Sequence, residues 1–350
     1  MKVLVIGGTG FISSRVVRRL LDAHHLVTVL TRGLSPYPIN HHPGLTTLVA
    51  DRHHESALRD ALGNRTFDAV YDMVAYRGEE ARSAVKIFRG RVGRFIHCST
   101  ISVYMISHDV QPPVTEDQDH GAVMEFFPRN PFGMTYGIDK RECERVLWDA
   151  HDEKTFPVSM LRPAYVCGPG DPSKRDYFWI ERILDGGPLL VPGSGDCVFQ
   201  SVYIEDVAWA FVRLLETPLS IGQAYNVAGK EIFSLKDYLF TLGHLLGRKP
   251  EVVHIDQEVF DALPFSLSPN GDVFTFNSRR TAIVSLEKIT QDLNFRPTPF
   301  LEWMPRTVDW FVNEQSGHSV GYERRGEELE FIRRWREEGG EKKPFNLTPL

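Results

Sequence analysis

Two residues capable of acid–base chemistry stand four positions apart near the middle of the chain, Tyr136 and Lys140. Residues with this spacing lie on the same face of a helix. A tyrosine ionises near pH ~10, which is too high for ready proton exchange at neutral pH, and a lysine ammonium beside it favours the phenolate. The pair could therefore act as a general acid or base. The spacing alone is common by chance, so its meaning depends on the elements around it.

A glycine-rich segment, GGTGFIS at residues 7–13, is a candidate phosphate-binding loop. It follows the apolar run Val3–Ile6 and precedes a stretch with helical spacing of apolar residues. At such a strand–helix junction the backbone N–H groups and the helix N-terminus favour a pyrophosphate. Gly7 permits the tight turn and Gly10 a close approach of the ligand, while Ser13 takes the third small position. The context predicts dinucleotide binding.

The end of the second expected strand indicates which dinucleotide is bound. An acidic residue there would hydrogen-bond the adenosine ribose, whereas a nearby arginine accommodates a 2′-phosphate. This chain has Thr31 and Arg32 at that place. A hydroxyl followed by a guanidinium favours NADP(H), and an NAD enzyme with Arg32 stacked on adenine is the alternative. Asp51, just after the third strand, is expected to meet the adenine edge, and residues 73–75 the far side of the cofactor.

The elements that must position these residues alternate between strand and helix. Short apolar runs predict buried strands, separated by helical patterns such as residues 79–88. This order predicts an α/β fold, a Rossmann-type doubly wound parallel sheet with a smaller C-terminal substrate-binding region. A long Pro- and Gly-containing loop is expected at 106–132, followed by a helix at 135–150 that carries Tyr136 and Lys140. The expected strands are 3–6, 27–30, 45–50, 69–71, 95–97 and 158–161.

The chain is expected to divide into three parts. Residues 1–165 form the NAD(P)-binding Rossmann domain, and residues 166–320 a substrate-binding region interleaved with the last sheet strands. Residues 321–350 form a charged C-terminal helix or tail. Leu329, Ile332 and Trp335 would give this tail a narrow apolar seam that docks on the body or on a partner subunit.

Several motifs in order along residues 1–312 resemble the extended short-chain dehydrogenases, the NAD(P)-dependent epimerase/dehydratase family. They are GGTGFI at 7–12, STISVY at 99–104, YGIDK at 136–140, LRPAYVCGPG at 161–170, VYIEDVAWA at 202–210 and LNFRPTPFLEWMPRTVDWF at 293–311. The resemblance implies that the hydroxyl of Thr100 holds the substrate oxygen beside Tyr136. It also implies that Lys140 binds the nicotinamide ribose and that residues 163–166 border the nicotinamide.

Together these arguments give one catalytic set and one cofactor set. The predicted catalytic residues are Thr100, Tyr136 and Lys140. The predicted cofactor-binding residues are Gly7, Thr9, Gly10, Phe11, Ile12, Thr31, Arg32, Asp51, Arg52, Ala75, Ser99, Lys140, Pro163 and Val166.

Departures from the family pattern narrow the chemistry. The family's dehydratases and decarboxylases carry acidic residues after the position of Thr100, and this chain has Ile101 and Ser102. Neither is a competent proton donor, so no dehydratase or decarboxylase activity is expected. The arginine that typically binds the substrate diphosphate is matched by Phe199. Arg279 and Arg280 are either a second diphosphate contact or surface charges. The pattern resembles UDP-galactose 4-epimerases and the family's carbonyl reductases.

Composition argues against several other classes of protein, namely those that bind nucleic acid, span a membrane, are secreted or bind a metal. The net charge of −6 argues against binding nucleic acid through bulk charge. No stretch approaches the ~18 apolar residues of a membrane helix, and the N-terminal apolar run is too short for a signal peptide. The cysteines and the three paired histidines form no metal-binding pattern, so no metal is expected. We expect a cytoplasmic enzyme with a small-molecule substrate, for which a nucleotide sugar is one candidate, and analogy predicts a homodimer.

Two classes of function stay open at this stage. The first is an oxidoreductase, either a sugar epimerase or a carbonyl reductase that uses Tyr136 as acid and base. The second is a non-catalytic NAD(P)-binding sensor or an RNA-binding relative within the family. The complete Thr100–Tyr136–Lys140 set favours the first, because a binding protein does not need it.

Overall fold

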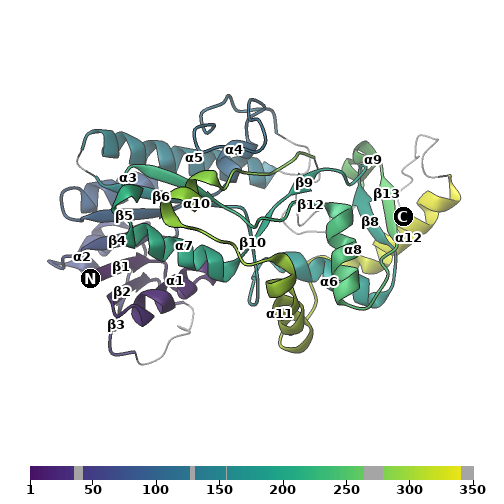
Figure 1. Cartoon of the computed structure of the whole chain (residues 1–350), viewed down its shortest axis with the longest axis horizontal. Helices are drawn as coiled ribbons and strands as arrows, with labels where there is room; N and C mark the ends of the chain where they lie inside the picture. Colours follow the sequence, from purple (N-terminus) through teal and green to yellow (C-terminus); the bar gives the residue numbers. More distant parts are fainter. Residues whose placement is uncertain (35–41, 127–130, 155, 264–278, 340–350) are drawn as a thin grey trace.

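A seven-stranded sheet forms one end of the molecule in the computed structural model, which describes residues 1–34, 42–126, 131–154, 156–263 and 279–339 (Figure 1). Its order is β11-β6-β5-β4-β1-β2-β3, and every neighbouring pair is parallel. The strands are β1 (Lys2–Ile6), β2 (Leu26–Thr31), β3 (Leu45–Val49), β4 (Ala69–Asp72), β5 (Arg94–Cys98), β6 (Val158–Pro163) and β11 (Gln223–Val227).

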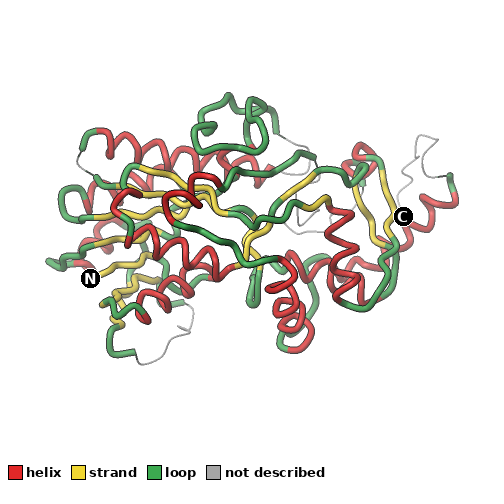
Figure 2. Tube along the Cα trace, in the orientation of Figure 1, coloured by secondary structure: helices red, strands yellow, loops and turns green. Residues whose placement is uncertain are grey.

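Helices cover both faces of this sheet (Figure 2). One apolar core joins it to α1 (Phe11–Asp22), α7 (Ile204–Glu216) and α10 (Glu287–Leu293), and another to α2 (Glu55–Leu62), α3 (Gly78–Phe88) and α5 (Pro131–Asp152). The central strands are buried apolar runs because both of their faces meet helices. The doubly wound Rossmann-type fold predicted from the sequence is confirmed.

The strand order reverses beside β1, which pairs with β2 on one side and with β4 on the other. The connections from the two sides diverge there and leave a crevice at the carboxyl ends of the strands. In sheets of this kind the crevice is where dinucleotides bind. The glycine-rich loop at residues 7–10 begins at this point of the sheet.

Two local elements differ from the expectation. Helix α5 begins at Pro131, four residues before the predicted start, because proline is tolerated in the first turn of a helix, where its missing N–H needs no partner. A short helix that the sequence did not predict, α4 (Ser102–Met105), lies between β5 and the segment expected to be loop. Residues 106–126 then run without a helix or strand, with isolated bridges such as Ser107 to Val123.

The second region, on the right in Figure 1, packs around an aromatic-rich core. Phe178, Trp179 and Phe199 all belong to this core, so packing explains each of them. The chain returns from this region to the main sheet through α7 and β11. The boundaries predicted at residues 165 and 320 stay predictions. The elements are β7 (Tyr165–Cys167), α6 (Arg175–Asp185), β8 (Leu189–Pro192), β9 (Val198–Phe199), β10 (Ser201–Tyr203), β12 (Phe233–Ser234), α8 (Leu235–Leu245), β13 (Val252–Ile255), α9 (Gln257–Asp261) and α11 (Phe300–Asn313).

The charged tail docks on the body of its own chain. After a short 3-10 turn, α12 (Arg325–Glu337) packs on α6, and Phe331, Ile332 and Trp335 are buried. Ile332 and Trp335 lie in the seam as predicted, whereas Leu329 is only partly covered and Phe331 is the third buried member. The tail is therefore part of the second region's core.

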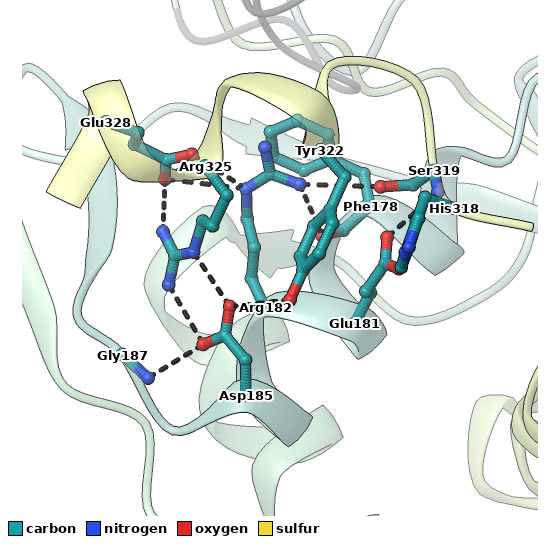
Figure 3. A network of polar contacts seen from close by, with 10 residues as sticks. All are labelled: Phe178, Glu181, Arg182, Asp185, Gly187, His318, Ser319, Tyr322, Arg325 and Glu328. Carbon is teal, nitrogen blue, oxygen red and sulfur yellow. Dashed lines mark hydrogen bonds and ion pairs between the residues drawn. The ribbon is translucent and has the colours of Figure 1, made fainter.

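Buried charges also join α12 to α6 (Figure 3). The Arg182 guanidinium lies 3.6 Å from the ring centroid of Phe178, and its Nε donates to Glu328 at 3.0 Å. Arg325 bridges Glu328 at 2.6 Å and Asp185 at 2.8 Å. These contacts hold the C-terminal half of α6 in place. They therefore also help to fix the position of its N-terminal end, which follows the cleft-lining Pro172.

Candidate active site

The glycine-rich loop has the geometry that a phosphate ligand requires. Gly7 has φ +83°, a left-handed conformation that favours glycine. A Cβ at Gly7 would come within 2.4 Å of the Val74 side chain, so the position has no room for one. Gly10 precedes the first turn of α1, whose N-terminal N–H groups lack partners within the helix. The loop and helix together fit a pyrophosphate group.

Ser13, the substitute for the family's third glycine, has a local function. Its hydroxyl donates to the Gly7 carbonyl at 2.5 Å and accepts the Gly10 N–H at 2.9 Å. The side chain is buried, so it packs between strand and helix without holding them apart. The serine therefore fixes both ends of the loop.

A cleft of about 640 Å³ opens along this loop toward the end of β2. Thr31 and Arg32 form part of its wall. Arg32 is exposed and makes no hydrogen bond or ion pair within the described part of the chain, so its guanidinium is available to a ligand. The predicted cofactor residues that line the cleft are Gly7, Thr9, Gly10, Phe11, Ile12, Thr31, Arg32 and Arg52.

The wall near β3 is built by Arg52 and His53. Arg52 is buried in an ion pair with Asp72, and it donates to the Glu80 carbonyl at 2.9 Å. The carboxylate of Asp51 accepts the His53 N–H at 3.0 Å, and its Oδ1 lies 2.6 Å from the imidazole Nδ1. Asp51 thus lies beside the cleft with its carboxylate engaged by His53, and the predicted contact with adenine stays a prediction.

The structure brings the predicted catalytic residues together near this cleft. Tyr136 and Lys140 lie on α5, and Thr100 follows β5. The phenol of Tyr136 is hydrogen-bonded with Thr100, while the Thr100 Oγ1 accepts the Ser102 N–H at 3.1 Å. Burial and the nearby Cys98 raise the pKa of Tyr136, and the hydrogen bond with Thr100 opposes this shift. In this state the phenol keeps its proton, as a general acid must.

Lys140 is held by the strand ends on both sides of it. Its Nζ donates to the carbonyls of Ala75 at 2.8 Å and Cys98 at 2.7 Å, and the side chain is buried. The same Nζ lies 5.9 Å from the ring centroid of Tyr136. Ala75 therefore contributes to the site through its carbonyl, by fixing the ammonium near the tyrosine.

Tyr76 is a site residue that the sequence reasoning missed. Its ring centroid is 4.9 Å from Lys140 Nζ and 6.4 Å from the ring centroid of Tyr136, and it lines the cleft. Burial raises the pKa of Tyr76, and the charge of Lys140 opposes that shift. The sequence could have indicated Tyr76, because it directly follows residues 73–75, which were expected to line the cofactor.

Ser99 belongs to a buried hydrogen-bond network next to the predicted catalytic residues. Its hydroxyl donates to Glu144, which also receives Arg162 Nε at 2.9 Å. The Arg162 Nη1 donates to the Tyr104 hydroxyl at 2.5 Å, and Nη2 pairs with Asp119 from the long loop. Tyr136, Lys140 and Glu144 repeat every four residues along α5, so their spacing could have indicated Glu144. The network ties α5, β5, β6 and the loop together.

The remaining predicted residues lie on the substrate side. The Pro163 carbonyl at the end of β6 accepts the Ile101 N–H at 3.1 Å, and Val166 lies on β7 paired with Val202. Phe199 is buried, and its ring centroid lies 6.0 Å from that of Tyr165. Arg279 pairs with Asp261, whereas Arg280 donates to the Met105 carbonyl at 3.1 Å.

A sheet of this order, with a glycine-rich turn after β1 and a tyrosine and lysine four residues apart beside the crevice, defines an enzyme of the extended short-chain dehydrogenase/reductase type. The chain belongs to the NAD dependent epimerase/dehydratase family, whose family model matches residues 3–228.

Known relatives of this chain include both binding and catalytic proteins. It is 27% identical to the chloroplast stem-loop binding protein of 41 kDa b of Arabidopsis thaliana, covering 85% of this chain and 75% of that protein. It is 24% identical to 2'-dehydrokanamycin reductase of Streptomyces kanamyceticus, covering 74% of this chain and 70% of that protein.

A solved structure gives the same fold. The UDP-glucuronic acid 4-epimerase of Bacillus cereus, in complex with UDP-glucuronic acid and NAD, has a TM-score of 0.68 at 20% identity. The match covers 90% of this chain and all of that one, at 100%. Within the described ranges, no group of three His, Cys, Asp or Glu side chains could hold a metal ion. None of the described helices has both the length and the apolar character to cross a membrane.

Proposed function

We propose that this enzyme is a carbonyl reductase that uses NADP(H) and reversibly reduces a ketone on a ring-bearing small molecule. The observation that carries the proposal is the hydrogen bond between Thr100 and Tyr136, with Lys140 fixed behind it, beside the dinucleotide cleft. This arrangement suits proton transfer to or from a substrate oxygen.

The residues of the cleft fit the cofactor that the family uses. Gly7 permits the tight turn of the loop at a position where a Cβ would collide with Val74, the N-terminal end of α1 suits the pyrophosphate, and Arg32 has no hydrogen bond or ion pair within the described residues. When bound, the cofactor supplies or accepts the hydride. Thr100 would hold the substrate oxygen, and Tyr136 would donate its proton as the ketone becomes an alcohol. Lys140 would place its charge beside the phenol and favour the phenolate left behind.

Reduction is favoured over nucleotide-sugar epimerisation by one feature of this chain: Phe199 is buried where the family's typical members place the arginine that binds a diphosphate. Ile101 and Ser102 follow Thr100, so no carboxylate stands ready for an elimination, which argues against a dehydratase. Stem-loop binding, named for the Arabidopsis relative, is not favoured because the net charge of this chain is −6.

The nucleotide carried by the purified protein separates these functions. The freshly purified protein is denatured, and any released nucleotide is identified by mass spectrometry. A reductase exchanges its cofactor at each turnover, so we expect little retained nucleotide and tighter binding of added NADPH than of NADH. Stoichiometric oxidised NAD in the supernatant would instead indicate an epimerase, which regenerates its cofactor in every cycle. Binding of neither nucleotide would refute catalysis.

The preference for NADP(H) has its own test in Arg32→Gln. We expect the Kd for NADPH to rise about tenfold or more, because a charge-assisted contact to the 2′-phosphate is lost, while the Kd for NADH changes little. Arg18→Gln, an exposed arginine on α1, is the matched control. Both constants can be measured by the fluorescence of the reduced nucleotide. An equal loss of affinity for NADPH and for NADH would show that Arg32 does not bind the 2′-phosphate.

A further inference from the structure

Arg175 stands where the second region meets the dinucleotide cleft. It is the first residue of α6, directly after the loop at residues 168–174. Pro172 of this loop lines the cleft, and Arg15 of α1 donates to the Pro169 carbonyl at 2.9 Å. The loop therefore fixes the start of α6 beside the cleft.

The guanidinium of Arg175 is held in position by a ring contact and a long ion pair, and it has few direct polar contacts. Its carbon Cζ lies 5.3 Å from the ring centroid of Tyr165, and 24% of the side chain is exposed. Its ion pair with Asp171 spans 3.9 Å, which is too long for a hydrogen bond. The Asp171 carboxylate instead accepts the Ser173 N–H at 2.9 Å. Among the described residues, Arg175 has no hydrogen bond for its five N–H donors.

The buried arginines of the same chain show the contrast. Arg162 donates to Glu144 at 2.9 Å, and Arg182 to Glu328 at 3.0 Å. Those two cations hold elements together, and each has a carboxylate in direct contact. Figure 3 shows that the Arg182 contacts tie α6 to α12 at the end of α6 away from Arg175. Arg175 thus lies on an anchored helix, with a long ion pair to Asp171 and the ring of Tyr165 beside its charge.

The positive charge of Arg175 also acts on Tyr136. Burial raises the pKa of Tyr136, and the charge of Arg175 opposes that shift. Arg32, by contrast, lines the cleft together with Leu30, Thr31 and Ala50, near the end of β2.

We propose that Arg175 binds an anionic group of the substrate, a carboxylate or a phosphate, and so holds the ketone beside Tyr136. The inference rests on the proposed function, because it takes Tyr136 as the acid–base residue. A guanidinium can pair with two oxygens of such a group at once, which fixes orientation as well as position. With Phe199 buried, this contact would replace the family's usual one and would select anionic ring ketones over neutral ones.

The test is a calorimetric titration of the cofactor-saturated protein with inorganic pyrophosphate and, separately, with malonate at constant ionic strength. Saturating the cofactor keeps both probes from the glycine-rich loop. We expect saturable binding of at least one probe, weakened about tenfold or more in Arg175→Met and partly kept in Arg175→Lys. Lys174→Met is the matched control, because its Nζ donates to the His318 carbonyl at 3.1 Å, and its affinity should equal the wild type's.

Each other outcome overturns the proposal. Absence of saturable binding in the wild type, or equal binding in Arg175→Met, would show that Arg175 recognises no substrate anion. A higher Kd for the cofactor in Arg175→Met, with unchanged probe binding, would assign the guanidinium to the cofactor's phosphates. Thermal melting of the variants separates these results from misfolding. Because no turnover is measured, a failed reductase assay leaves this result intact.

Discussion

Replacement of Tyr136 by phenylalanine is expected to lower kcat by about 10²–10⁴-fold, the contribution typical of a general acid or base. The substitution removes only the phenolic hydroxyl, so the ring packing near Lys140 remains. The hydroxyl is the group hydrogen-bonded with Thr100. The measurement is NADPH consumption with a panel of ring ketones, together with the Kd for NADPH, which should not change.

Tyr76→Phe provides the comparison for this prediction. Tyr76 lies even closer to Lys140, with its ring centroid 4.9 Å from Nζ against 5.9 Å for Tyr136. Proximity to the lysine alone would therefore favour Tyr76 as the acid. Because it lacks the hydrogen bond with Thr100 that Tyr136 has, we expect the Tyr76 variant to lose far less of kcat. A larger loss in Tyr76→Phe than in Tyr136→Phe would reverse the assignment.

The largest effect on stability is expected from Arg162→Met. The side chain of Arg162 is 1% exposed and pairs with Glu144, whose side chain is 2% exposed. Although burial disfavours the charge, the carboxylates of Glu144 and Asp119 hold the pKa of Arg162 above its usual value. Methionine would leave Glu144 buried without its cation. Breaking a buried pair in this way costs about 3–5 kcal/mol of unfolding free energy, measurable by urea denaturation.

Arg145→Met is the control on the same helix. Arg145 pairs with Glu142 and Asp149 at 2.8 and 2.9 Å, but its side chain is 59% exposed. An exposed pair contributes about 0–1 kcal/mol, so this variant should unfold near the wild-type urea concentration. The double change Arg162→Met with Glu144→Leu should recover part of the loss, because the buried carboxylate of Glu144 is then removed together with its cation. A loss in Arg162→Met no larger than in Arg145→Met would show that the network does not stabilise the fold.

Much of the fold could be predicted from the sequence because its signals are local. Val3–Ile6 and the other apolar runs have no polar face, as expected for strands buried on both sides. The glycine-rich loop follows the first run directly, and Tyr136 and Lys140 lie at helical spacing. These patterns involve residues only a few positions apart, so they can be recognised without knowledge of the tertiary structure.

The missed features depend on contacts between distant segments. Arg162 and Arg182 look like any other arginine in the sequence, and their buried partners Glu144 and Glu328 lie 18 and 146 residues away. Phe331 replaces Leu329 in the buried seam because the orientation of α12 is set by the pairs that Arg325 and Glu328 make with α6. Nothing in the sequence around Arg175 marks it, because its proposed role depends on the loop before α6, whose Pro172 lines the cleft.

The most direct test of the central claim is the fate of a deuteride from NADPH labelled at the transferable position of the nicotinamide. The protein is incubated with the labelled cofactor and a mixture of anionic and neutral ring ketones, and the products are analysed by mass spectrometry. We predict an alcohol that carries deuterium on the former carbonyl carbon, formed by the wild type and not by Tyr136→Phe. A product without deuterium, or equal labelling by Tyr136→Phe, would contradict the account.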